Sequence, residues 1–133
     1  MTTRRNAGMR NKYKVSPPEK RRALGRTFGS QAEKRYALML EACVECEAIF
    51  DYICQPKVWL GVPENIYVPD FLVVPSGATP YYVDVKGVET AKFKRDKKLW
   101  KQYGRLTLHI VKEKKPSVFE TVELIGGGYD ADR

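Results

Sequence analysis

Two carboxylates and one amine lie within short apolar segments of this sequence. Asp70 interrupts the segment IYVPDFLVV, and Asp84 interrupts YYVDVKG, where Lys86 follows it by two places. Carboxylates are unfavourable to bury unless they are paired or bind a metal ion. Two converging carboxylates could hold a hard divalent cation such as Mg²⁺. A lysine beside them could orient or help deprotonate a water held by that ion, or neutralise charge developing on a phosphate.

These side chains would be positioned by two predicted strands joined by the turn PSGATP. Side chains two apart in a strand lie on the same face, so Asp84 and Lys86 should face one side. Val83 and Val85 should face the other side, toward a core. If Asp70 on the adjoining strand reaches the same point, the two carboxylates meet there. The alternatives are an ion pair between Asp84 and Lys86 on an exposed sheet, and a strand-edge role for Asp70.

A helix is predicted before these strands, because apolar residues recur at spacings of three and four between Ala32 and Cys43. Ser30 is a favourable N-cap, and Glu33, three residues later, completes the pattern of a capping box. The helix should therefore begin next to Ser30.

The remaining elements follow from the same patterns. Residues 48–60 alternate aromatic and β-branched side chains around Pro56, which predicts two short strands or one bulged strand. A basic amphipathic helix is predicted over 91–103 and a strand over 105–112. Residues 117–125 should form a short closing helix.

A chain of 133 residues fits one compact domain. We expect this domain over residues 28–126, between a basic and flexible arm over 1–27 and a tail over 127–133.

Positive charge is concentrated at the N-terminus. The net charge is +8, and residues 1–26 alone carry nine basic side chains and one acid. A polycationic arm on a neutral body favours a polyanionic partner, nucleic acid first, although such an arm could also serve only solubility. The candidate DNA-binding residues of the arm are Arg4, Arg5, Arg10, Lys12, Lys14, Lys20, Arg21, Arg22 and Arg26.

The basic helix over 91–103 could bind the phosphates that flank a cut, or it could simply be a solvated face. Lysines around a helix indicate phosphate affinity rather than base reading, so we expect recognition of DNA shape. The candidates on this helix are Lys92, Lys94, Lys97 and Lys98.

Other site types are less well supported. Cys43, Cys46, Cys54 and His109 could in principle complete a zinc site, but the CxxC pair falls in a predicted helix without a glycine-rich knuckle. We interpret the cysteines as small core residues. No apolar run approaches the roughly 20 residues that cross a bilayer, and the N-terminus lacks the apolar stretch of a signal peptide. The sequence therefore predicts a cytoplasmic protein without a membrane partner.

The acid–acid–lysine order resembles the PD-(D/E)xK nuclease superfamily. Its signature is present as Pro69-Asp70, thirteen intervening residues, and Asp84-Val85-Lys86. The resemblance implies an α/β fold with a restriction-endonuclease-like αβββαβ core, in which helices flank a mixed central sheet. It also implies that Asp70, Asp84 and the backbone carbonyl of Val85 bind Mg²⁺, for which Mn²⁺ would substitute. Lys86 would then position the attacking water.

Many members of this superfamily carry a glutamate near the site on their first helix, and Glu33 occupies that position. The resemblance implies that Glu33 helps to hold a metal-bound water or a second ion. The alternative is that Glu33 only caps the helix.

A narrower similarity covers residues 28–112. FGSQAEKRY, QPK, YVPDF and VDVKG, followed by a basic helix, resemble small phage-encoded endonucleases and Holliday junction resolvases. One difference is that the second acid is an aspartate rather than the glutamate common in resolvases. The resemblance implies a metal-dependent endodeoxyribonuclease that nicks branched DNA, in particular four-way junctions, by phosphodiester hydrolysis. Two symmetric nicks imply a two-fold homodimer. If the protein is phage-encoded, it would act in the cytoplasm of the host.

Two alternatives remain open. The protein could be a nuclease of nicking, flap or restriction type. It could also be a non-catalytic nucleic-acid-binding module in which the acids are structural.

Overall fold

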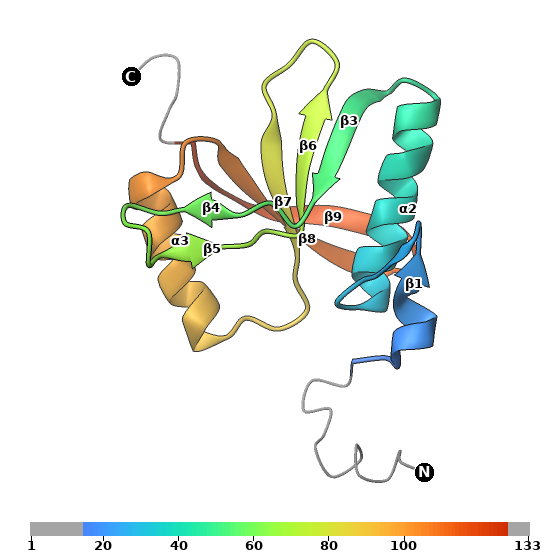
Figure 1. Ribbon diagram of the computed structural model, residues 1–133, viewed down its shortest axis with the longest axis horizontal. Coiled ribbons are helices and arrows are strands. Elements are labelled where there is room, and N and C mark those ends of the chain that lie inside the picture. The colour runs from blue at the N-terminus through green and yellow to red at the C-terminus, as the bar shows by residue number, and fades with distance from the viewer. Residues whose placement is uncertain (1–14, 128–133) are drawn as a thin grey trace, which may run out of the picture.

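A mixed five-stranded sheet lies between two helices in the computed structural model, which describes residues 15–127 (Figure 1). The strand order is β3-β6-β7-β8-β9, and all neighbours are antiparallel except β7 and β8, which are parallel. The architecture is therefore α/β. The strands are β3 (Ile49–Cys54), β6 (Phe71–Pro75), β7 (Tyr81–Val85), β8 (Thr107–Lys115) and β9 (Val118–Gly126).

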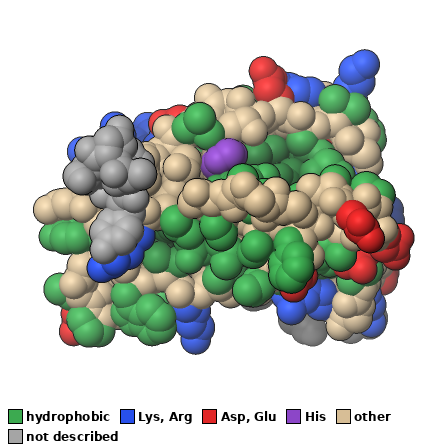
Figure 2. Space-filling view, turned by 90° about the horizontal axis from the view of Figure 1, so that it is seen from above, with side chains coloured by type: hydrophobic (Ala, Val, Ile, Leu, Met, Phe, Trp, Pro, Cys, Tyr) green, Lys and Arg blue, Asp and Glu red, His purple; other side chains and the backbone are tan. Residues whose placement is uncertain are grey.

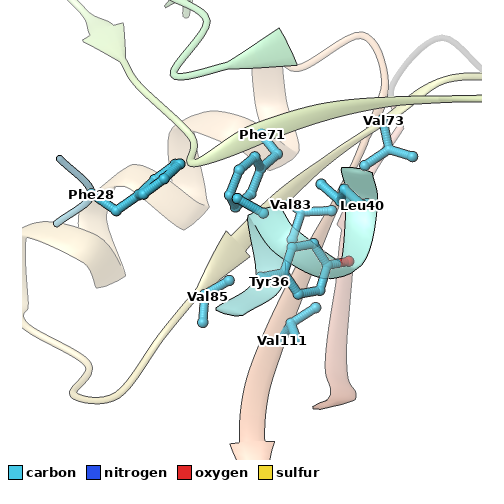
Figure 3. Close-up of a cluster of buried hydrophobic side chains, with 9 residues drawn as sticks. Phe28, Tyr36, Leu40, Phe71, Val73, Val83, Val85 and Val111 are labelled. Atoms are coloured by element: carbon cyan, nitrogen blue, oxygen red, sulfur yellow. The ribbon is translucent and has the colours of Figure 1, made fainter. Parts of the chain in front are cut away.

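The first helix, α2 (Gln31–Glu45), covers one face of the sheet. It begins at Ser30 as predicted, since the Ser30 hydroxyl accepts a hydrogen bond from the Glu33 N–H at 3.1 Å. Its apolar side packs Tyr36 and Leu40 against the sheet, where the buried cluster of Figure 3 is formed. That cluster consists of Phe28, Tyr36, Ala37, Leu40, Phe71, Val73, Val83, Val85 and Val111.

The second helix, α3 (Ala91–Tyr103), covers the other face. Thr90 caps it, and Trp100, with 0% of its surface exposed, packs with Leu108, Ile110 and Ile125 in a second cluster. Val83 and Val85 face the first core as predicted. The face that carries Asp84 is buried as well, because α3 covers it.

A small hairpin packs on α3 and consists of β4 (Val58–Trp59) and β5 (Ile66–Tyr67). The prediction of two short strands around Pro56 is confirmed by β3 and β4. The segment 66–74, expected as one strand, is divided into β5 and β6. The division falls at Pro69, which lacks the N–H that a continuous ladder requires.

The prediction of a closing helix over 117–125 is wrong. Residues Val118–Gly126 form β9, which pairs antiparallel with β8 along nearly its whole length. The segment is rich in β-branched residues, which favour strands when an edge is available for pairing. Ser117 adopts a left-handed φ of 65° in the turn that reverses the chain.

Regular structure begins at residue 18, within the segment expected to be a flexible arm. It consists of η1 (Pro18–Arg21) and the hairpin of β1 (Arg22–Ala23) with β2 (Arg26–Thr27). Arg21 fixes this segment, since its guanidinium donates to the carbonyls of Ser16 and Phe28, each at 2.7 Å. The rest of the expected arm, 1–14, lies outside the described residues, as does the expected tail apart from Gly127. Between residues 15 and 127, neither helix has the length and apolar character needed to cross a membrane.

Candidate active site

The two aspartates meet where β6 begins and β7 ends. Phe71 pairs with Val83 in the β6–β7 ladder, and this register continued by one residue sets Asp70 opposite Asp84. The Asp70 N–H donates to Oδ1 of Asp84 at 2.9 Å, and the Val85 N–H donates to Oδ2 of Asp70 at 2.7 Å. The structure therefore brings together the two carboxylates singled out in the sequence.

Asp84 is buried and Asp70 is partly buried. Asp84 is 1% exposed, and its Oδ2 has no hydrogen-bond partner among residues 15–127. Burial raises the pKa of Asp84 to about 7, against the opposing effect of Lys86. Burial, together with the charge of Glu33, raises the pKa of Asp70 to about 7. Two anions in this position are strained electrostatically, and a bound cation would relieve that strain.

Lys86 lies on the same side as Asp84, as strand geometry predicts. Its Nζ is 3.8 Å from Oδ2 of Asp84 and 4.4 Å from the centroid of the Phe93 ring. Its backbone N–H donates to the Val111 carbonyl at 2.9 Å, which extends the β7–β8 pairing past the end of β7. The amine is thus placed beside the acids and is 28% exposed at its side chain.

Glu33 combines a structural contact with proximity to the aspartates. Its Oε1 accepts a hydrogen bond from the Gly29 N–H at 3.1 Å, whereas in a capping box it would accept from the Ser30 N–H. Burial raises the pKa of Glu33, while Gly29 and Lys86 lower it. Because its charge also raises the pKa of Asp70, Glu33 belongs to the same electrostatic site.

An open pocket of about 270 Å³ gives access to Glu33 and Lys86, and neither aspartate lines it. It is lined by Glu33 and Lys86 together with Gly29, Ser30, Val85 and Gly87. A phosphate group could therefore approach Lys86 from the side of the α2 N-terminus.

The carboxylate oxygens at this site suit a cation that keeps several bound water molecules. Within the described part of the chain, no three His, Cys, Asp or Glu side chains are arranged to hold a metal ion together. Two carboxylates plus waters are, however, a coordination that Mg²⁺ accepts. The buried and unpartnered Oδ2 of Asp84 is an oxygen that such an ion would satisfy. The residues present thus fit a hydrated divalent cation rather than a fully enclosed one.

The predicted phosphate-binding residues of α3 divide into two groups. Lys94 and Lys98 are exposed. Lys97 bonds Glu89 and Glu123, and Lys92 bonds Asp96 at 2.8 Å. Lys97 therefore links α3 to β9 and is less free to bind DNA than the sequence suggested.

The candidates of the arm also separate by environment. Lys20, Arg22 and Arg26 are exposed on η1 and the β1–β2 hairpin. Arg21 instead fixes the local backbone. Five further candidates lie outside the described residues: Arg4, Arg5, Arg10, Lys12 and Lys14.

Two residues near the site were not identified as such from the sequence. Asp96 is 6% exposed, and its charge contributes to the raised pKa of Asp84. The spacing of Asp96 in the sequence indicates its burial, because it lies three residues after Phe93 and four before Trp100, on the apolar side of α3. Gln55 has a left-handed φ of 54°, and its N–H donates to the Asp70 carbonyl at 2.9 Å. Gln55 thereby helps to fix the backbone of Asp70.

No model of a known protein family matches this chain, and no curated protein matches it either. The likeness to PD-(D/E)xK nucleases therefore rests on the residues and arrangement described above.

The raised pKa values of the aspartates make the stability of the metal-free protein depend on pH. Each folded-state pKa of about 7 lies above the ordinary value of 3.8. The contribution of these groups to folding is therefore complete below about pH 4 and is lost as pH rises through about 7. Between pH 5 and 8, each carboxyl should lower the free energy of unfolding by on the order of 2 kcal/mol. Asp84→Asn should therefore show about half of the decrease in the free energy of unfolding that the two carboxyl groups together cause between pH 5 and 8.

Denaturant unfolding of the full-length protein in EDTA, at pH 5, 6, 7 and 8, measures the effect. Glu64→Gln is the matched control, because Glu64 is an exposed carboxylate in the β4–β5 loop. In Glu64→Gln the free energy of unfolding should decrease with pH as steeply as in wild type. An Asp84→Asn variant that loses as much stability as wild type over this range would contradict the assignment.

Proposed function

We propose that this protein is a metal-dependent DNA endonuclease of the PD-(D/E)xK type. The observation that carries the proposal is the meeting of the buried carboxylate of Asp84 with the partly buried carboxylate of Asp70, with an amine 3.8 Å from Asp84. The element order α2, β3, β6, β7, α3, β8 supports a restriction-endonuclease-like αβββαβ core. The β7–β8 pair, which is parallel across the α3 crossover, agrees with this core.

Asp70, Asp84 and the Val85 carbonyl would hold Mg²⁺ or Mn²⁺. When bound, the ion would lower the pKa of a water and neutralise charge on the scissile phosphate. Asp70 and Asp84 would orient that ion because backbone N–H groups fix one oxygen of each carboxylate. This leaves Oδ2 of Asp84, which has no hydrogen-bond partner among the described residues, for the ion.

Lys86 and Glu33 would act on the attacking water and the phosphate. Lys86, fixed between Asp84 and the Phe93 ring, would orient the water and place positive charge beside the phosphate. Glu33 would accept a hydrogen bond from a water in the same pocket. The water oxygen bonds to phosphorus as the bond to the leaving sugar oxygen breaks.

We take branched DNA, in particular the four-way junction, as the preferred substrate. Resolution of a junction needs two symmetric nicks, whereas one chain supplies one site, so a two-fold homodimer follows. Exposed apolar side chains support such an association. Figure 2 shows them spread over the face of the molecule seen from above, and Phe50 and Leu124, at the two edges of the sheet, are 72% and 64% exposed. The protein would act in a cytoplasm.

Replacement of Asp84 tests the site directly. Asp84→Asn keeps the oxygen that accepts the Asp70 N–H but removes the charge that would hold a cation. We expect cleavage of a labelled four-way junction in Mg²⁺ to fall at least about a hundredfold, with DNA binding retained. Cleavage at the wild-type rate would refute the site.

A panel of labelled substrates separates the alternatives. If wild type cuts flapped or nicked duplex and leaves the junction intact, the substrate assignment fails and the nuclease assignment stands. If it binds DNA without metal-dependent cutting of any substrate, the protein is a binding module.

Replacement of Glu33 separates capping from catalysis. Glu33→Gln keeps a side-chain oxygen for the Gly29 N–H and keeps the Ser30 cap, which depends on the backbone of residue 33. We expect the unfolding temperature to stay within about 3 °C of wild type. Junction cleavage should fall at least about tenfold, because the variant no longer places a negative charge at the pocket. Unchanged cleavage would assign Glu33 to capping alone.

Removal of the first fourteen residues tests the arm. The deletion stops before η1, because Arg21 and Phe28 tie residues 16–28 to the fold. It removes five basic residues and no acid. The slope of log affinity against log salt should become shallower by about 0.9 for each phosphate that the arm neutralises in the wild-type complex.

The matched control for the deletion scrambles residues 2–14 and so keeps their charge. The scrambled arm should retain the wild-type slope. A deletion variant with an unchanged slope would mean that the arm does not touch phosphate.

A further inference from the structure

The β4–β5 hairpin presents an apolar surface to solvent. Trp59 pairs with Ile66 across the hairpin. Val68 lies two residues beyond Ile66. The exposed fractions of Trp59, Ile66 and Val68 are 56%, 43% and 45%. We call these three residues the hairpin patch. A contiguous exposed apolar surface that includes a tryptophan is typical of a binding surface.

The hairpin patch is held in place by the opposite side of the hairpin. Tyr67 is 7% exposed and packs its ring against Phe93 and Trp100, at centroid distances of 6.5 and 5.8 Å. The loop is closed by the Leu60 N–H, which donates to the Asn65 carbonyl at 2.8 Å, and by the Asn65 amide, which donates to the Leu60 carbonyl at 3.2 Å. A ligand would therefore meet a preformed surface.

A groove of about 300 Å³ connects the hairpin patch with the candidate active site. Ile66 and Val68 line it together with Lys86, which also lines the pocket beside Glu33. The remaining lining residues are Tyr67, Thr90, Lys92, Phe93 and Asp96. Lys92 pairs with Asp96, so the charges of these two groove residues cancel. Lys86 then gives the groove a positive charge at the end that lies beside Asp84.

We propose that the hairpin patch binds an unpaired nucleotide of the substrate strand next to the scissile phosphate, with its base stacked on Trp59. The proposal rests on the proposed nuclease function and narrows its substrate class to DNA with splayed or unpaired bases beside the cut. Bases inside a continuous duplex are stacked on each other and cannot offer a face to Trp59. An apolar and aromatic surface that continues into a lysine-lined groove matches the two parts of a nucleotide, its base and its phosphate.

Tryptophan fluorescence provides a direct readout. The chain has two tryptophans, and Trp100 is fully buried, so quenching by a bound base should come from Trp59. The full-length protein in EDTA, without divalent metal, is titrated with a forked duplex and with a blunt duplex of the same length. We expect strong quenching with the fork and little with the blunt duplex. Trp59→Phe, which retains only Trp100, should show almost none.

Affinity measurements with labelled DNA test the energetic role. Trp59→Ala should weaken binding to the fork about tenfold or more and leave binding to the blunt duplex nearly unchanged. Trp59→Phe should restore most of the affinity. Leu38→Ala is the matched control, since Leu38 is an exposed apolar residue on α2 that lines neither the groove nor the pocket beside Glu33. It should bind both DNAs as wild type does.

Three results would overturn the proposal. The first is an equal decrease of fork and duplex binding in Trp59→Ala. The second is absence of quenching by the fork. The third is a Trp59→Ala variant that no longer forms a concentration-dependent dimer while it keeps its preference for the fork, which would make the patch a subunit interface. Because these measurements exclude metal and cleavage, a protein that passes them but never cuts DNA would refute only the nuclease function.

Discussion

The site depends on the pairing of β6 with β7. Their register sets Asp70 opposite Asp84, and two hydrogen bonds then join each strand end to a carboxylate of the other strand. The side chains thus complete a ladder whose backbone bonds end at Phe71 and Val83. Asp84 is buried and Asp70 is partly buried, and this burial is the main cause that raises the pKa of each to about 7, while the backbone hydrogen bonds oppose the rise. The fold therefore holds two carboxyl groups together at a position that disfavours their charged forms.

The site lies at the junction of the two cores. The cluster under α2 supplies Phe71 and Val85, which flank the aspartates in sequence, and the cluster under α3 supplies Phe93, beneath Lys86. A bidentate ion pair from Arg35 to Glu113, at 2.6 and 2.9 Å, joins α2 to β8 on one side. Bonds from Lys97 join α3 to β9 on the other. Glu33 and Lys86 can consequently keep their mutual position although they come from different elements.

Much of this arrangement could be predicted from local patterns. Alternation in the strands predicted that Asp84 and Lys86 share a face, and helical spacing with a serine cap predicted α2. Local patterns gave wrong predictions where tertiary contacts determine the structure of a segment. Residues 117–125 became a strand because β8 offered an edge, and residues 18–27 acquired structure because Arg21 satisfies two carbonyls and Phe28 enters the core. Whether a lysine is exposed or ion-paired likewise depends on a partner distant in sequence, as Lys97 and Glu123 illustrate.

Lys86 is the point at which the two openings of the site meet. The pocket beside Glu33 and the groove beside the hairpin both include it, and its amine is held between the Asp84 carboxylate and the Phe93 ring. A strand that occupied both openings would have to pass over this amine, which would place a phosphate next to the aspartates. The positive charge would then attract the backbone, while the apolar hairpin would favour a base that has left its stack. On this view the proposed preference for branched DNA would arise from the shape and chemistry of the two openings rather than from the proposed catalytic groups, which would treat any phosphodiester alike.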